Sequence, residues 1–239
     1  MANGADIERI ADEIYKSYMD DDVSIASYLE KLEIGSATYK DAERYAQHLG
    51  THSGRAIWDA YERITGMPPT GETFDYDLLE RALRARAKDD YDKVIAYVKD
   101  VQEQLNYMAG LSMNAIVPEY SESRVDNLLW KITADPGETE KFRSLLESAV
   151  ENMAMSIVDD SIEKNAGAQY DAGLRPTITR TVVGSGCVWC RGLAGTRNYS
   201  RTMDKEIFRR HQRCRCIVTY DPGTGRRFQD VWSKQWTNR

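Results

Sequence analysis

The chain has 239 residues, of which 41% are apolar and 29% charged, and its formal net charge is −6. This length and composition allow one or two domains with a hydrophobic core and exclude an intrinsically disordered chain. Because no apolar run is long enough to span a bilayer and the first residues lack the pattern of a signal peptide, we expect a protein of the reducing cytosol without a membrane partner.

The charges are divided unevenly along the chain. From Leu174 to Arg239 there are 14 Lys and Arg against 4 Asp and Glu, whereas the preceding residues hold 18 basic and 34 acidic side chains. A basic segment of this kind indicates contact with nucleic acid or with a charged assembly surface. Docking of the basic segment on the acidic part of the same chain is an equally good interpretation.

The first 173 residues show the three-to-four spacing of apolar residues that is typical of amphipathic helices. Thr38 and Asp41 have the spacing of a capping box at the start of a long helix, which Gly50 or Gly54 would interrupt. The helices are predicted at about 7–18, 25–32, 38–64, 75–105, 123–132 and 135–170.

The clearest start signal for a helix is Asp135-Pro136-Gly137-Glu138. Asp at the N-cap, Pro at the first helical position and Glu at the third each favour the first turn. Segments 66–71 and 110–120 lack periodicity and contain Gly and Pro, which predicts connectors, and Gly173 is the predicted end of the last long helix.

After Gly173 the sequence becomes β-branched and alternating, which predicts strands at 177–183, 216–220 and 227–232. We therefore predict an α+β fold, with an acidic, mostly helical domain at 1–173 and a small, β-rich, Cys-containing domain at 174–239. A domain of that size has a thin core, so a cross-link or a bound ion would help to stabilise it.

All four cysteines lie between residues 187 and 216, as a Cys-x2-Cys pair and a Cys-x-Cys pair, with His211 beside the second. Thiolates and imidazoles are preferred zinc ligands, and a Cys-x2-Cys turn presents two of them. Alternate residues of a strand share one face, so the second pair can also point inward. We predict a structural zinc site, with disulfides or unligated buried thiols as alternatives. The candidate ligands are Cys187, Cys190, Cys214, Cys216 and His211, where His211 replaces one thiol or orients the site from outside.

The other two histidines, His48 and His52, are four residues apart, so an unbroken helix places both on one face. This spacing can hold a metal ion, but the zinc-protease pattern requires Glu after the first His, where Leu49 stands here. Gly50 also weakens the helix between them. We interpret both as ordinary surface or core histidines.

The segment 175–236 resembles the C-terminal signature of the Mu F-like head-morphogenesis family of tailed-phage minor head proteins. That signature has a Cys-x2-Cys pair followed by Leu-x-Gly, and later a His-x2-Cys-x-Cys run that leads into a strand. The final residues, 230–236, are similar to the ending of short minor capsid proteins from phages of Gram-positive hosts, whereas the helical part carries no motif. The matching residues are Cys187, Cys190, Leu193, Gly195, His211, Cys214 and Cys216.

The resemblance implies a non-enzymatic structural protein of the virion that acts in head morphogenesis and in DNA packaging or delivery. It implies the portal protein and other head proteins as partners. It also implies a location in the capsid, and in the host cytoplasm during assembly. No small-molecule substrate is expected.

Packaged DNA is a further expected partner, through phosphate contacts that carry no sequence readout. An alternative function is a small nuclease or nucleotide-modifying toxin domain with His211 as general base, although no carboxylate pair or Ser/His/Asp arrangement accompanies it, and no catalytic residue is assigned. The candidate phosphate-binding residues are Arg180, Arg209, Arg210, Arg213, Arg215, Arg226 and Arg227.

Overall fold

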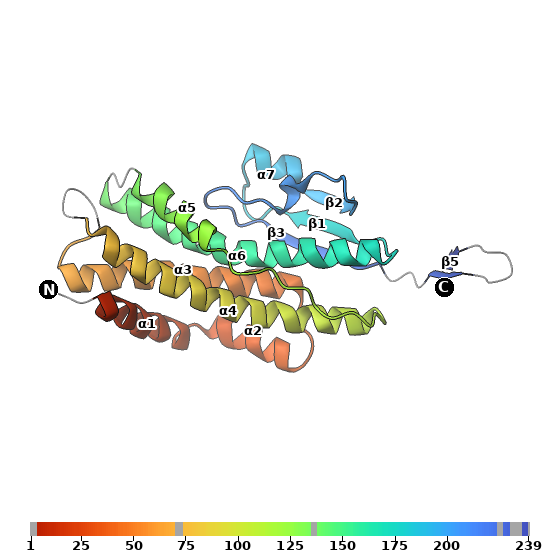
Figure 1. Ribbon diagram of the computed structural model, residues 1–239, viewed down its shortest axis with the longest axis horizontal. Helices are drawn as coiled ribbons and strands as arrows, with labels where there is room; N and C mark the ends of the chain where they lie inside the picture. Colours follow the sequence, from red (N-terminus) through yellow and green to blue (C-terminus); the bar gives the residue numbers. More distant parts are fainter. Residues whose placement is uncertain (1–3, 70–73, 135–137, 224–226, 230–235, 239) are drawn as a thin grey trace.

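A computed structural model of the protein describes residues 4–69, 74–134, 138–223, 227–229 and 236–238. The long helices run side by side, and a small sheet lies on one side of helix α6, as Figure 1 shows. The predicted α+β fold is confirmed. Within the described ranges, no helix is both long and apolar enough to cross a membrane.

The long helices lie close to their predicted positions, whereas the two short ones after residue 187 were not predicted. They are α1 (Gly4–Asp20), α2 (Val23–Glu33), α3 (Tyr39–Thr65), α4 (Tyr76–Met108), α5 (Glu122–Thr133), α6 (Thr139–Asp171), the short α7 (Val188–Leu193) and the 3₁₀ helix η2 (Lys205–Phe208). The strands are β1 (Thr177–Thr181), β2 (Gly195–Asn198), β3 (Ile217–Asp221), β4 (Arg227–Gln229) and β5 (Trp236–Asn238).

Local sequence signals set several of these ends. The predicted capping box at α3 is present, with Thr38 and Asp41 each bonding the other's backbone N–H. The side chain of Asp75 accepts from Leu78 N at 3.1 Å and caps α4. Gly173, with a φ of 86°, follows the last turn of α6, in the left-handed region that glycine adopts without strain.

The start of α6 differs from its prediction. Glu138 occupies the N-cap position without a side-chain hydrogen bond, rather than the third helical position. The predicted cap residues 135–137 lie outside the described residues. The helix therefore begins about one turn later than expected, and Glu140 is the acidic residue that faces the positive end of its dipole.

Helix α3 passes through Gly50 and Gly54 without the predicted break. A Cβ atom at Gly50 would lie 2.6 Å from Glu151 Cα, and one at Gly54 would lie 2.8 Å from Glu147 Cα. The missing side chains allow α3 and α6 to approach closely, and these two helices make the most extensive contact between elements. The glycines serve helix packing, which outweighs their low helix propensity.

The sheet has the order β2-β1-β3 with antiparallel pairing throughout. Strand β2 was not predicted. The third predicted strand, 227–232, is described only over β4, which pairs with β5 instead of joining this sheet, and residues 230–232 lie outside the described residues. In Figure 1 strand β5 is drawn clear of the helices.

Two large buried apolar clusters form most of the core of the described residues, beside a small one around the cysteines. One surrounds Trp58 and Phe142 and is built from the helices. The other joins helical residues such as Tyr45 to Ile178 of β1 and Val218 of β3. The sheet therefore shares a core with α3, α4 and α6, while the division into domains at residue 173 stays a prediction.

A buried charge cluster ties the C-terminal segment to the helices. The Arg210 side chain is 3% exposed, and it donates to Glu43 Oε1 at 2.6 Å and to Asp159 Oδ2 at 2.5 Å. Burial raises the pKa of Glu43 well above its usual range; Arg210 opposes this rise and Asp159 adds to it. Glu43 Oε1 also accepts from Val218 N at 3.2 Å, so one carboxyl of α3 holds both Arg210 and strand β3.

Replacing Arg210 should destabilise the protein far more than replacing its neighbour. Arg210→Met leaves two buried carboxyl groups without their cation, which should lower the free energy of unfolding by about 3–5 kcal/mol. Arg209→Met is the matched control, because Arg209 is 71% exposed and a surface change of this kind is worth about 0.5 kcal/mol or less. Equal midpoints of urea unfolding for the two variants would contradict this assignment.

Gly50→Ala should also destabilise the protein, although alanine favours helices by about 1 kcal/mol. The added methyl group meets the backbone of α6, so we expect a loss of roughly 1–3 kcal/mol. Gly192→Ala in α7 is the control, since its Cβ would meet no atom within 4 Å, and it should be neutral or slightly stabilising. Thermal unfolding of both variants measures the difference, and a Gly50→Ala protein as stable as the parent would rule out the steric argument.

Candidate metal centre

The cysteine-rich segment forms a compact unit beside the sheet. A turn at 184–186 leads from β1 to Cys187, which is the N-cap residue of α7, and its Sγ accepts from Cys190 N at 3.3 Å. A second turn closes with Cys214 N donating to His211 O at 3.1 Å, and Arg213 within it adopts a φ of 60°. The two turns face each other, as the spacing of the cysteines predicts.

The structure brings the predicted donor atoms together. Cys190 Sγ lies 3.8 Å from Cys214 Sγ and 2.9 Å from His211 Nε2. Cys187 Sγ lies 3.3 Å from the same histidine nitrogen. The donors form two groups, Cys187–Cys190–His211 and Cys190–Cys214–Cys216, and within each group the ligand atoms lie within 4.8 Å of one another. Cys190 belongs to both groups and is therefore the central donor.

The distance between Cys190 Sγ and Cys214 Sγ suits a bound ion better than a covalent bridge. All four cysteines are free thiols, and the 3.8 Å separation of Cys190 and Cys214 is far longer than a disulfide bond. Tetrahedral coordination with metal–sulfur bonds of about 2.3 Å places two sulfur atoms about 3.8 Å apart. The cluster can therefore hold a metal ion.

His211 is oriented by groups outside the cluster. Its Nδ1 lies 2.6 Å from Gln212 O, which favours the proton on Nδ1 and leaves the Nε2 lone pair directed at the thiols. The ring of Trp189 meets it edge-on at 5.6 Å, and Asn152 of α6 donates to its carbonyl oxygen at 2.9 Å. This support is what a metal-binding histidine requires.

The thiols differ in acidity. Burial, with Cys216 and Cys214 adding to it, raises the pKa of the Cys190 thiol to about 12. The backbone N–H of Cys190 lowers the pKa of the exposed Cys187 thiol. An ion that binds here must displace a proton from Cys190, so binding should release protons and weaken as the pH falls.

Arg180 lies at this cluster and not on a nucleic-acid surface, which corrects the sequence-based interpretation. It is 1% exposed, and its Nη2 donates to Cys214 Sγ at 3.2 Å while Nη1 donates to Ile207 O at 2.6 Å. Its guanidinium also lies 5.4 Å from the centre of the Trp189 ring. Its buried positive charge can offset the negative charge of thiolates, but it cannot reach a phosphate.

Arg210 is a second correction, because it is buried between Glu43 and Asp159. Arg209, Arg213 and Arg215 are exposed. Arg213 Nη2 donates to Ser144 Oγ at 2.6 Å, and Arg215 Nε lies 3.5 Å from Glu151 Oε1. Arg226 lies outside the described residues, and the side chain of Arg227 is not described. Several C-terminal cations thus pair with the acidic helices, which supports the docking interpretation of the charge asymmetry.

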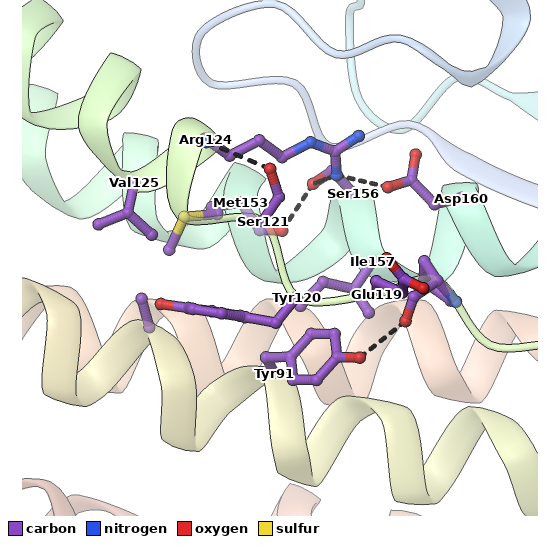
Figure 2. Close-up of a pocket in the computed structure, with 12 residues that line it drawn as sticks. Tyr91, Glu119, Tyr120, Ser121, Arg124, Val125, Met153, Ser156, Ile157 and Asp160 are labelled. Atoms are coloured by element: carbon purple, nitrogen blue, oxygen red, sulfur yellow. Dashed lines mark hydrogen bonds and ion pairs between the residues drawn. The ribbon is translucent and has the colours of Figure 1, made fainter.

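Two cavities lie along α5 and α6, and one of them is lined by His211. A cleft of about 540 Å³ between α5, α6 and the His211 turn is lined by both basic and acidic side chains. The second pocket, of about 30 Å³, lies between α4, α5, α6 and the connector that ends at Ser121, and Figure 2 shows residues that line it. Arg124 and Asp160 form an ion pair beside this pocket, and Tyr91 donates to Pro118 O at 2.7 Å. A space of this size holds a water molecule or two, not a substrate.

Sequence reasoning missed a third group of potential ligands. His48 and His52 lie on one face of α3, as their spacing implies, and both contact a single oxygen of Asp22. Asp22 is far from both histidines in the chain, so their i,i+4 spacing could not identify it.

Comparisons of the chain with models of known protein families, with curated protein sequences and with solved structures find no match.

Cys190 should matter more than Cys187 for metal binding, because it is the donor common to both groups. Cys190→Ser should abolish retention of a divalent metal ion by the cysteine cluster against a chelator, whereas Cys187→Ser removes one exposed donor and should weaken retention at this cluster less. Elemental analysis after dialysis under reducing conditions measures the difference. Equal loss in both variants, or no metal bound to the parent protein, would contradict a site centred on Cys190.

Proposed function

We propose that this chain is a structural protein of a tailed-phage head, similar to the Mu F-like minor head proteins, in which zinc holds the C-terminal unit together. The observation that carries the proposal is that the residues that match the family signature lie together in the C-terminal unit and shape its candidate metal site. The five donor residues form two overlapping groups, Cys187–Cys190–His211 and Cys190–Cys214–Cys216, which share Cys190. Leu193 ends α7 and Gly195 begins β2, where a φ of 110° suits glycine.

Zinc is the ion that this donor set favours. Thiolate sulfur and imidazole nitrogen are its usual ligands in a tetrahedral site, and calcium and magnesium prefer oxygen. Each group supplies three donors, and an ion that also took a donor from the other group would have a closed tetrahedral shell, which is typical of a structural site rather than a catalytic one. Zinc bound by two facing turns would fix the segment between them, which has only a small core of its own.

The chemistry at His211 favours a structural role over the nuclease alternative. Its Nε2 lies among the thiols of Cys187 and Cys190, and its Nδ1 faces Gln212 O. In this arrangement neither nitrogen is available as a general base, and no described carboxylate contacts the ring. No specific observation therefore favours an enzyme.

Protein surfaces are the partners that the charge distribution favours. Arg210 and Arg215 face acidic residues of the helices, as does Lys205, which lies 3.0 Å from Glu163. Fewer basic side chains of the C-terminal segment are therefore available to an outside partner than its content of Lys and Arg suggests. We propose the portal and other head proteins as partners, with DNA limited to phosphate contacts by exposed side chains such as Arg209 and Arg213.

A virion protein should be found in purified particles. Mass spectrometry of gradient-purified virions of the phage that encodes this chain should detect it at low copy, with the major capsid protein as positive control. A phage enzyme that stays in the lysate is the matched negative control. A portal gene is expected beside its own gene. Absence from the particles, with normal abundance in the infected cell, would overturn the proposal.

A further inference from the structure

A second cluster of potential metal ligands lies in the helical part, away from the cysteines. Asp22 follows the end of α1 and is the N-cap residue of α2, whereas His48 and His52 lie one turn apart on α3. Asp22 Oδ2 lies 2.6 Å from His48 Nδ1 and 2.8 Å from His52 Nε2. One carboxylate oxygen therefore lies between two imidazole nitrogens.

The surroundings hold the three side chains in place. Asp22 Oδ1 accepts from Ser24 N at 2.9 Å, so the cap fixes the carboxylate and directs its other oxygen at the histidines. Tyr18 stacks on His52 at 5.8 Å between ring centres, and Tyr28 meets His48 edge-on at 5.7 Å. The His52 side chain is only 12% exposed, so the cluster is set into the surface.

We propose that Asp22, His48 and His52 form a second metal site, which binds a divalent transition-metal ion of the zinc class independently of the cysteines. Two imidazoles and one carboxylate are a donor set that such ions accept, and the ligand atoms all lie within 4.8 Å of one another. Calcium and magnesium are not expected, because two of the three donors are nitrogen.

The ion would replace the protons that now lie between the nitrogens and the carboxylate. Bonds of about 2.1 Å in a tetrahedral arrangement separate two ligand atoms by roughly 3.4 Å, so the present contacts must open by less than 1 Å. His48 is the more exposed histidine and can make that movement. His52 Nδ1 is buried without a hydrogen-bond partner in the described part of the chain, so a proton moved onto it breaks no existing bond.

Within the part of the chain that the structure describes, this group has no second group of donors beside it, whereas the two cysteine groups share Cys190. A tetrahedral ion bound by Asp22, His48 and His52 would therefore keep one position for water or for an outside ligand. An ion here also joins the α1–α2 junction to the middle of α3. Binding should therefore stabilise the contact of these two segments, by an amount that rises with the logarithm of the metal concentration above the dissociation constant.

Metal stoichiometry tests the proposal. Metal-free protein is titrated with Zn²⁺ or Co²⁺, and bound ions are counted after removal of the excess. The double variant His48→Gln/His52→Gln should bind one equivalent fewer than the parent. Asp22→Asn keeps the helix cap, because Asn is as good a cap as Asp, but should weaken this site by at least about 100-fold. Asp21→Asn, an exposed neighbour, is the matched control and should bind as the parent does.

Variants in one site at a time distinguish metal bound at the histidines from metal bound at the cysteines. Cys190→Ser should still bind Co²⁺ at the histidines, and its spectrum should lack the thiolate-to-metal charge-transfer band. This result is expected whether or not the parent protein binds metal at its cysteines. Circular dichroism verifies that each variant is folded. If the double variant does not fold, Asp22→Asn alone tests the site. If Asp22→Asn or the double variant binds as many equivalents as the parent, with unchanged affinity, the cluster is a hydrogen-bonded clamp and the proposal is overturned.

Discussion

The position of the C-terminal segment depends on Arg210. A guanidinium that has lost nearly all its water must be matched by carboxylates at short distance, and Glu43 of α3 and Asp159 of α6 provide them. Because Glu43 also binds the backbone of β3, the same group that neutralises Arg210 fixes the sheet. The contact of α3 with α6 must itself be close for the two carboxylates to face one cation, and Gly50 and Gly54 make it so.

The cysteine cluster uses a buried cation in a different way. Arg180 projects from the central strand β1 and reaches Cys214, so the strand that organises the sheet also supplies a charge to the thiols. His211 is oriented by Gln212 and linked to α6 through Asn152. The donors therefore depend on the sheet and on the helices, and not only on the two turns that carry them.

Much of the architecture could be predicted from the sequence because its signals are local. Apolar periodicity located the helices, and the capping box of Thr38 and Asp41 placed the start of α3. The convergence of the cysteines followed from their spacing. The errors came from long-range contacts. Gly50 was expected to break a helix because its partner in α6 is a hundred residues away. Arg180 and Arg210 were expected at a surface because their buried partners cannot be recognised from composition. Asp22 was not predicted as a ligand because its contact with His48 and His52 is also long-range.

The four thiols of the cluster do not meet the solvent equally. Cys187 is exposed and its pKa is lowered, whereas the other three are buried, and the pKa of Cys190 is raised. Thiolates are the forms that react with oxidants and alkylating reagents. Chemical damage to the metal-free protein should therefore start at Cys187 and reach the central donor Cys190 later. The cluster would lose its outermost ligand while the Cys190–Cys214–Cys216 group was still intact.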